Sequence, residues 1–266
     1  MPKTRLDLLL VTRGLADSRA KAQALVMAGQ VRVDGQVVDR PAVNFAEDVD
    51  VTVNGSPRFV SRGGEKLEAA LTTFPVNVTG RICADVGAST GGFTDCLLQH
   101  GATKVYAIDV GKGLLHWKLR TDPRVVVMEK TNARFVESLP EPVSLVTIDA
   151  SFISLKILLP VIKGWSLPPS SEQLGDGGVI ALIKPQFEAG RKETARGQGV
   201  IRDSAVHRAV LIDVISFAQS IGFGLSGLLR SPVLGPKGNV EFFAWLGMGH
   251  HGGMDLEILV TKGLVK

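Results

Sequence analysis

Short apolar segments typical of strands alternate with segments of helical pattern from Arg81 onward, and this feature constrains the fold most strongly. Such alternation predicts a doubly wound, mostly parallel sheet with helices on both faces. We expect strands at residues 81–86, 104–109, 125–128, 144–149 and 178–184, and helices at 65–73, 92–100, 113–120, 153–165 (bent or ended near Pro160) and 204–221.

The end of this region departs from the alternation. Residues 224–233 and 240–245 have strand patterns, and the short connection leaves no room for a helix, so they are predicted to form a hairpin. A mostly parallel sheet closed by one antiparallel strand resembles the Rossmann-like α/β sheet of class I methyltransferases. Residues 249–266 are predicted to be a loose tail, and the isolated pair His250 and His251 gives no argument for a metal site.

The first 60 residues have the pattern of a separate, small α+β unit. Two helices ending at Gly14 and Gly29 precede short strands around the turn Asp34-Gly35. This stretch resembles the RNA-binding module of the S-four type in Arg5-Leu6-Asp7, Ser18-Arg19-Ala20-Lys21-Ala22, Gly29, Val31, Val33, Asp34-Gly35 and Pro41. The resemblance implies RNA contacts by Arg5, Arg13, Arg19, Lys21 and Arg32, and the alternative is a solvated helix face. We therefore expect an RNA-binding domain at residues 1–60 and a catalytic domain at 61–248.

Composition limits the partners and the location. The net charge of +4 permits nucleic acid as a partner without demanding it. The sequence has no secretion signal and no apolar run long enough to span a bilayer, which favours a cytoplasmic protein with no membrane partner. Cys83 and Cys96 are the only cysteines and cannot build a disulfide framework or a four-thiolate zinc site, so we expect no metal. The oligomeric state is left open.

A glycine-rich loop follows the first strand of the predicted sheet and opens the first helix. Its glycines let the chain turn sharply and approach a ligand closely. The spacing fails the G-x-G-x-x-G dinucleotide fingerprint and lacks the G-K-[ST] of a nucleoside-triphosphate loop. It resembles motif I of the S-adenosylmethionine methyltransferases, in which the loop wraps the methionine part of the cofactor. The cofactor-binding residues implied here are Asp85, Gly87, Ala88, Ser89, Gly91, Gly92 and Phe93.

Three further strand ends supply candidate contacts to the same cofactor. Asp109 ends the second strand, where a carboxylate can accept hydrogen bonds from both ribose hydroxyls of a nucleoside. Asn132 follows the third strand and is either a contact to the adenine edge or an ordinary turn residue. Asp149 ends the fourth strand and is expected to border the methyl group.

Four charged residues fall where this architecture binds its ligands: Lys66, Asp149, Lys184 and Glu241. A lysine directly after a buried strand, such as Lys184, is uncommon because burying a charge is costly. The order Lys, Asp, Lys, Glu resembles the catalytic tetrad of the FtsJ-like ribose 2′-O-methyltransferases. The chain as a whole, over residues 3–247, resembles the TlyA or haemolysin A family of ribosomal RNA methyltransferases.

The resemblance implies methyl transfer from S-adenosylmethionine to a ribose 2′-hydroxyl of ribosomal RNA, free or within ribosomal subunits. The enzyme must align that hydroxyl and help to remove its proton, which a partly deprotonated lysine can do. We assign Lys184 as this base or as an orienting group, with Lys66 as its cationic neighbour. Asp149 would orient Lys184, and Glu241 would hold the lysines. Carboxylates oppose deprotonation of a neighbouring lysine, so both roles stay open.

The segment after Lys184 is glycine-rich and charged. Residues 187–203 are predicted to form a mobile lid that grips RNA phosphates through Arg191, Lys192, Arg196 and Arg202, or else a plain flexible loop. Two other classes of function stay open. One is a non-catalytic RNA-binding or ribosome-assembly factor. The other is a membrane-lytic protein, which no strongly amphipathic basic helix supports.

Overall fold

The computed structural model describes residues 3–53, 58–165, 177–190, 193, 197–248 and 256–264. The chain divides into two compact units, Met1–Arg58 and Phe59–Lys266, here called the N-terminal unit and the catalytic unit. Each unit has its own hydrophobic core, so each is described by itself.

The N-terminal unit contains two helices and two small sheets. The helices are α1 (Leu6–Thr12) and α2 (Arg19–Met27), and Ser18 caps α2 by accepting a hydrogen bond from the Lys21 backbone amide. One sheet pairs β1 (Lys3–Arg5) with β4 (Asn44–Ala46), and the other has the order β3 (Gln36–Val37), β2 (Val31–Val33), β5 (Val51–Val53). The two expected helices and the short strands after them are present, but β1 precedes the helices, and Arg5 lies in this strand where the sequence analysis expected no strand.

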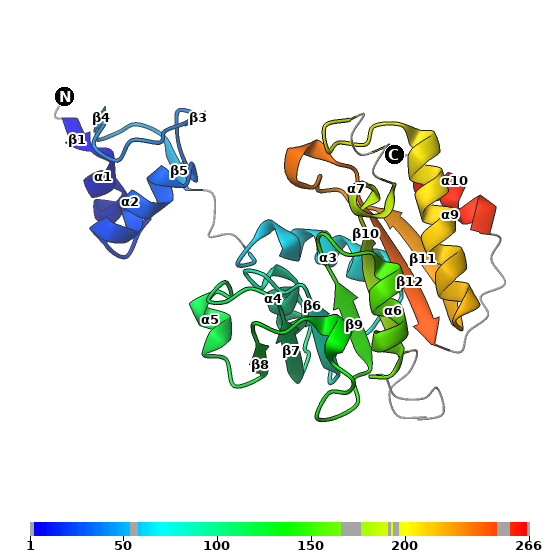
Figure 1. The fold of residues 1–266 in the computed structure, drawn as a ribbon. Helices are drawn as coiled ribbons and strands as arrows, with labels where there is room; N and C mark the ends of the chain where they lie inside the picture. The colour runs from blue at the N-terminus through cyan, green and yellow to red at the C-terminus, as the bar shows by residue number, and fades with distance from the viewer. Residues whose placement is uncertain are drawn as a thin grey trace. The chain divides into compact units, whose positions relative to one another are not determined.

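A seven-stranded sheet forms the centre of the catalytic unit (Figure 1). Its order is β11 (Phe223–Arg230), β12 (Phe242–Met248), β10 (Gly178–Ile183), β9 (Leu145–Ile148), β6 (Ile82–Val86), β7 (Lys104–Ile108), β8 (Val125–Met128). β12 runs antiparallel to β10 and β11 on either side of it, and the other six strands all run in one direction. The predicted Rossmann-like sheet with a closing hairpin is therefore confirmed.

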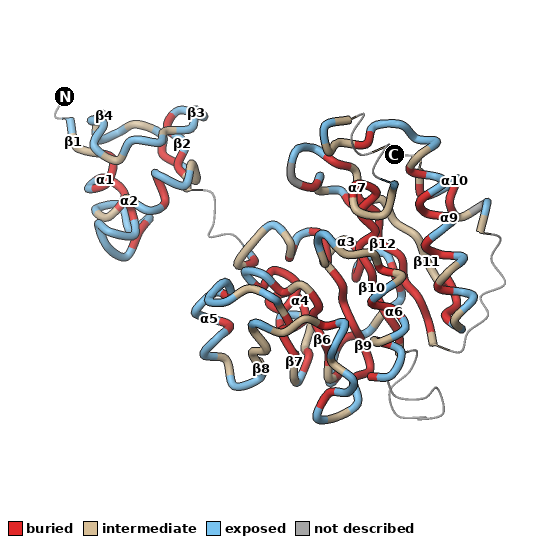
Figure 2. The backbone as a smooth tube through the Cα atoms, viewed as in Figure 1, coloured by how far each residue is buried: buried red, intermediate tan, exposed pale blue. Residues whose placement is uncertain are grey.

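Helices cover both faces of the sheet. On one face lie α6 (Leu155–Lys163), α9 (Ser204–Ser220) and α10 (Leu256–Leu264), and on the other lie α3 (Arg62–Thr73), α4 (Gly92–Gln99) and α5 (Trp117–Arg120). Alternate strand residues enter the two cores: Val146 faces the first set of helices and Leu145 the second. Figure 2 shows the consequence: the five inner strands are buried along nearly their whole length, whereas the edge strands β8 and β11 are half-buried over most of theirs.

The structure corrects three expectations from the sequence. Residues 256–264 form α10, which packs on α9 and β11 with Val260 fully buried, so the loose tail was wrong there. The helix expected at 113–120 is only the single turn Trp117–Arg120. Pro160 lies inside α6 and does not end it, because Leu158, Leu159 and Ile162 keep both sides of the proline packed on the sheet.

Candidate active site

The glycine-rich loop turns between β6 and α4 at the carboxyl edge of the sheet. Gly87 and Gly91 have φ angles of 84° and 95°, in the left-handed region that favours glycine. A Cβ on Gly87 would lie 2.6 Å from the carbonyl oxygen of Asp149, and a Cβ on Gly91 would meet the Leu119 side chain at 2.2 Å. These two glycines therefore let the loop lie directly against the ends of its neighbours.

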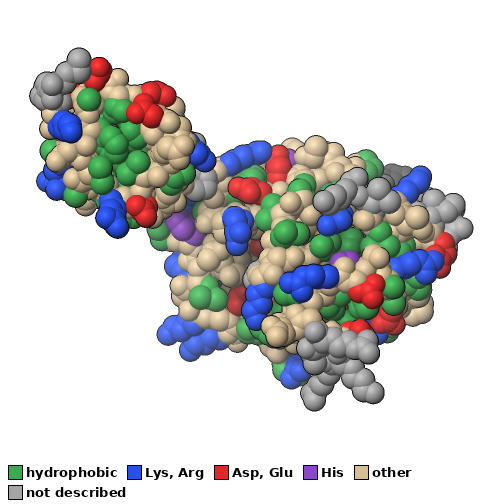
Figure 3. All heavy atoms as spheres, turned by 90° about the horizontal axis from the view of Figure 1, so that it is seen from above, with side chains coloured by type: hydrophobic (Ala, Val, Ile, Leu, Met, Phe, Trp, Pro, Cys, Tyr) green, Lys and Arg blue, Asp and Glu red, His purple; other side chains and the backbone are tan. Residues whose placement is uncertain are grey.

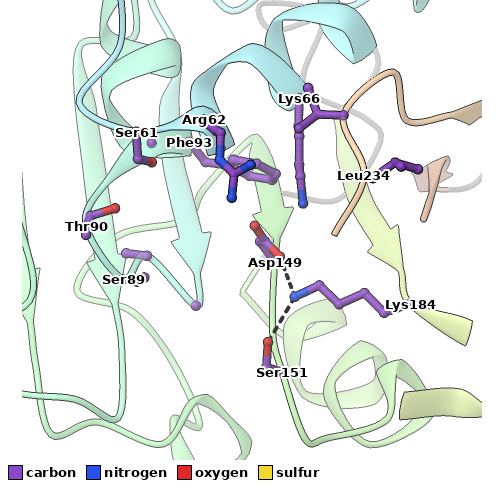
Figure 4. A pocket seen from close by; sticks show the side chains of 15 residues that line it. Ser61, Arg62, Lys66, Ser89, Thr90, Phe93, Asp149, Ser151, Lys184 and Leu234 are labelled. Carbon is purple, nitrogen blue, oxygen red and sulfur yellow. Dashed lines mark hydrogen bonds and ion pairs between the residues drawn. The ribbon is translucent and has the colours of Figure 1, made fainter. Parts of the chain in front are cut away.

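Two hollows open on either side of this loop. The first, of about 330 Å³, is lined by Ser61, Arg62, Gly63, Lys66, Gly87, Ala88, Ser89, Thr90, Gly92, Phe93, Asp149, Ser151, Lys184, Val233 and Leu234 (Figure 4). The second, of about 570 Å³, includes Asp109 and Asn132 and shares Gly87, Ser89, Asp149 and Ser151 with the first. The shared residues make the two hollows neighbours, and predicted catalytic and cofactor residues line both of them.

Asp109 closes the second hollow from the end of β7. Its Oδ2 accepts a hydrogen bond from the Ser89 amide at 2.8 Å, and its Oδ1 accepts one from the Gly111 amide at 2.7 Å. Each carboxylate oxygen keeps a second lone pair that can accept from a ligand. Asn132 caps a short 3-10 helix, η1 (Ala133–Phe135), by accepting from the Arg134 amide, and still lines the hollow. Asn132 therefore has the turn role that the sequence offered, and its contact to adenine stays a prediction.

Asp85 and Gly91 are the two cofactor candidates that line neither hollow. Asp85 is fully buried, and its carboxylate accepts hydrogen bonds from Thr94 at 2.7 Å and Thr147 at 3.3 Å. Burial raises the pKa of Asp85 to about 7. Asp85 thus ties the start of α4 to β9 and supports the loop from within the core.

The four charged residues form two separate ion pairs. Lys184 Nζ lies 2.6 Å from Asp149 Oδ1 and donates to Ser151 Oγ at 3.0 Å (Figure 4). Lys66 Nζ lies 2.6 Å from Glu241 Oε2. The Lys66 and Lys184 side chains are 10 % and 8 % exposed, whereas Glu241 is fully buried and lines neither hollow. The contact between Lys184 and Asp149 was expected from the sequence. Glu241 was expected to hold both lysines, but its ion pair is with Lys66.

Sheet topology explains this convergence. Asp149 and Lys184 directly follow the parallel strands β9 and β10, so both lie at the carboxyl edge. Because β12 is antiparallel to β10, with Ile183 opposite Phe242, its first residues reach that same edge and bring Glu241 beside Lys184 in the register. The start of α3 supplies Lys66 from above the sheet.

Three further side chains of this region were not singled out from the sequence. Ser151 holds Lys184, and Gln186 donates to Glu241 Oε1 at 3.2 Å. Phe152 is 90 % exposed, has a φ of 63° and lies with its ring centroid 4.8 Å from that of Phe187. The sequence signal that could have identified them is their position, two or three residues after Asp149 or Lys184.

The predicted RNA contacts of the N-terminal unit have structural partners within it. Arg5 and Arg19 each contact the buried carboxylate of Asp7 at 3.0 Å and, with Gln23, hold the pKa of that carboxyl well below its usual range. Arg13 donates to the backbone carbonyls of Val49 and Glu47, and Arg32 to that of Gly35. Lys21 is exposed on α2. The partly exposed arginines are thus held in fixed positions, as a recognition surface requires.

The structure describes only part of the segment 187–203, which was predicted to form a lid. Arg191, Lys192 and Arg196 lie outside the described residues. The first turn after Lys184 is α7 (Pro185–Glu188), and Ile201, near the other end of the segment, is buried. Residues 199–201 are hydrogen-bonded to Asn239, so this end of the segment is anchored.

One group among the described residues has the composition of a metal site. Glu68 Oε2, Cys96 Sγ and His100 Nε2 all lie within 4.8 Å of one another. A hydrogen bond of 2.5 Å between His100 and Glu68 accounts for this arrangement, and none of the three lines either hollow. Among the described residues that line the two hollows, no comparable cluster of candidate metal ligands is found.

Comparison with known proteins places this geometry in a family. The pattern of the FtsJ-like methyltransferases matches residues 59–248, and that of the S4 domain matches residues 4–48. The chain belongs to the FtsJ-like methyltransferase family. This FtsJ-like methyltransferase is 44% identical over 248 residues to the 16S/23S rRNA (cytidine-2′-O)-methyltransferase TlyA of Mycobacterium tuberculosis, covering 92% of this chain and 90% of TlyA.

Two further relatives cover nearly the whole FtsJ-like methyltransferase. YqxC of Bacillus subtilis, named as a candidate rRNA methyltransferase, is 48% identical over 260 residues, which are 94% of this chain and 89% of YqxC. A solved structure described as a candidate hemolysin of Streptococcus thermophilus is 41% identical with a TM-score of 0.72, covering 99% of this chain and 96% of that one. Among the described residues, no helix is both long and apolar enough to cross a bilayer.

Proposed function

We propose that this protein transfers a methyl group from S-adenosylmethionine to a ribose 2′-hydroxyl of ribosomal RNA. The observation that carries the proposal is the meeting of Lys184, Asp149 and Lys66 in a hollow beside the glycine-rich loop. The names of the relatives TlyA and YqxC, and the match of the first residues to an S4 domain, support RNA as the substrate.

The residues that line the two neighbouring hollows suit the parts of this cofactor. Loop residues 87–93 would hold the methionine part, Asp109 the ribose hydroxyls, and Asn132 the adenine edge in the larger hollow. When bound, S-adenosylmethionine supplies a methyl group already activated by its sulfonium. The protein therefore needs to orient an acceptor oxygen and manage its proton, and no metal is required for that task.

Lys184 is placed to carry out this task. Asp149 and Ser151 fix two directions around its Nζ, and a third substituent position on the nitrogen remains for the acceptor hydroxyl. Phe187, with its ring centroid 5.7 Å from Nζ, covers the lysine on one side and limits access of water. A hydroxyl bound there would be oriented by Lys184. In the uncharged amine, the two hydrogens on Nζ serve Asp149 and Ser151, and the lone pair in the third position takes the proton of the hydroxyl as the new bond forms.

Phe152 provides a surface for the base of the acceptor nucleotide. Its ring stands in solvent at the mouth of the larger hollow, directly after Ser151. A non-glycine residue at positive φ is strained, and such strain tends to persist where it serves a site. An exposed aromatic ring beside the active site of an RNA-modifying enzyme can stack on an unpaired base, and such stacking contributes about 1–3 kcal/mol to binding.

The test is transfer of radiolabelled methyl groups to ribosomal subunits from cells that lack the gene. We expect Lys184→Ala to lower turnover by about 10²–10⁴-fold while the dissociation constant for S-adenosylmethionine stays unchanged. Lys156→Ala is the matched control, because Lys156 also pairs with an aspartate, Asp213, but lies on the exposed side of α6. A 2′-O-methyl group is identified when the labelled nucleotide's 3′ phosphodiester bond resists alkaline hydrolysis, because that cleavage needs a free 2′-hydroxyl. RNA binding without incorporation above the Lys184→Ala level would instead identify a non-catalytic RNA-binding or assembly factor.

A further inference from the structure

Two loops that are distant in sequence are joined beside the catalytic pair of Lys66 and Glu241. Asn239 is only 3 % exposed; its Oδ1 accepts from the Ile201 amide at 3.0 Å, and its Nδ2 donates to the Gly199 carbonyl at 2.9 Å. The ring of His207 lies 3.0 Å from the Ile201 carbonyl and fixes the same loop from α9. The buried amide of Asn239 therefore holds residues 199–201 against the loop of residues 235–239.

The joined loops enclose a hollow with a positive lining. It has a volume of about 450 Å³ and is lined by Gly197, Gln198, Val200, Arg202 and Lys237. Within the part of the chain that the structure describes, neither Arg202 nor Lys237 forms an ion pair. Lys237 takes a φ of 66°, and its Nζ lies 3.9 Å from where a Cβ on Gly199 would stand, so its ammonium group lies over the opposite loop. The described lining of this hollow thus contains two cations and no acid.

We propose that this hollow binds a phosphodiester group of the substrate RNA, next to the acceptor nucleotide. The inference rests on the proposed function and names the contact that positions the strand. A guanidinium and an ammonium group around a polar hollow suit a phosphate, because both donate charge-assisted hydrogen bonds to its oxygens. Figure 3 looks onto the carboxyl edge and shows Lys and Arg side chains gathered on this face of the catalytic unit.

The position of the hollow agrees with this role. Leu234 lines the catalytic hollow, and Lys237 follows it by three residues, so their Cα atoms are separated by at most about 11 Å. One strand of RNA can therefore reach from the acceptor site to Lys237.

The same loop also contacts the catalytic carboxylate. The Gly235 amide donates to the Asn239 carbonyl at 2.8 Å, and a Cβ on Gly235 would lie 2.2 Å from Glu241 Oε1. Phosphate binding and the placement of Glu241 thus depend on one small loop. Asn239 is accordingly a positioning residue that keeps the phosphate hollow in register with the acceptor site.

The experiment measures affinity for a fluorescent ribosomal RNA fragment against KCl concentration, with methyl transfer measured in parallel. The variants are Arg202→Gln, Lys237→Gln and their double variant. Lys163→Gln is the matched control, since it removes one positive charge at the far end of α6, where Lys163 donates to the Ile221 carbonyl.

We expect the double variant to bind RNA about tenfold more weakly near physiological salt, and to flatten the slope of log affinity against log salt by about 1.5. The dissociation constant for S-adenosylmethionine and the melting temperature should match the wild type. Arg202→Lys should keep more of the salt dependence than Arg202→Gln, because it keeps the positive charge.

An unchanged slope in the double variant, or equal flattening in Lys163→Gln, would overturn the phosphate site. This result is separate from a failure of the proposed function, which would appear as RNA bound by the wild type with no methyl transferred. The binding arm needs no turnover, so the hollow is tested in either case.

Discussion

Lys66 Nζ lies 2.6 Å from Oε2 of Glu241, a residue 175 positions later in the chain and fully buried. This contact divides the proposed catalytic set into two pairs, with Lys184 and Asp149 lining the hollow and Lys66 held by the buried carboxylate of Glu241. The second pair supports the first, because Lys66 lines the same hollow as Lys184.

Replacing one member of the buried pair should damage both activity and stability. In Glu241→Gln, Lys66 keeps its charge in a buried place without a compensating carboxylate, which costs about 3–5 kcal/mol of unfolding free energy. Urea titration checks this value, and methyl transfer should fall by at least about tenfold. The double variant Lys66→Met with Glu241→Gln should regain part of the stability but none of the activity. Equal stability of Glu241→Gln and wild type would contradict the buried pairing.

Gly235→Ala should impair the chemical step without weakening cofactor binding. The new Cβ would lie 2.2 Å from Glu241 Oε1, and the carboxylate cannot yield because Lys66 and Gln186 hold its two oxygens. A displacement of about 1 Å in a catalytic group can cost about 10²-fold in rate. Turnover and the dissociation constant for S-adenosylmethionine are measured together. Gly190→Ala is the control, since a Cβ there has nothing within 4 Å; equal losses in both variants would contradict the prediction.

Asp85 should make the protein less stable as the pH rises. Burial raises the pKa of Asp85 to about 7, from an ordinary value of 3.8. Between these values the folded state binds a proton that the unfolded state has lost. The stabilisation is therefore complete below pH 4 and is lost as the pH rises through about 7, at about 1.4 kcal/mol per pH unit.

Asp85→Asn removes this titration and keeps an oxygen that can accept from Thr94. The difference in unfolding free energy between variant and wild type should grow in favour of the variant from pH 5 to pH 8. Chemical denaturation at several pH values measures it. A difference that stays constant over this range would show that Asp85 titrates normally.

Phe152→Ala should weaken productive RNA binding and leave the cofactor site intact. Loss of base stacking corresponds to about 1–3 kcal/mol, or about 5- to 150-fold in kcat/KM for RNA. Phe152→Trp should retain most of the activity, because it keeps an aromatic face. Phe135→Ala is a fair control, since Phe135 is also exposed but lines neither hollow. The stacking role fails if the two alanine variants behave alike.

The sequence predicted the residues that follow single strands better than the contacts between distant segments. Asp109, Asp149 and Lys184 could be identified because the carboxyl ends of parallel strands meet at one edge. The pairing of Lys66 with Glu241 depends on how α3 and β12 pack, which no local pattern encodes. For Asp85, the place in the motif predicted a ligand contact, whereas the structure shows a buried carboxylate that holds Thr94, and the ligand contact stays a prediction.

Local patterns also failed where packing outweighs propensity. The tail after residue 248 reads as glycine-rich and polar at its start, yet Leu256, Leu259, Val260 and Leu264 recur at helical spacing and pack α10 on the sheet. Pro160 is tolerated for a similar reason, because the buried face of α6 continues on both sides of it.

The late position of β12 in the sequence has a consequence for synthesis. Glu241 comes from the last strand of the sheet, so the ribosome makes Lys66, Asp149 and Lys184 long before it makes their fourth partner. The N-terminal unit, with its own core, can fold while the chain is still growing. A chain stopped before β11 would therefore carry its RNA-binding module and its cofactor loop, yet leave Lys66 without the buried carboxylate that holds it.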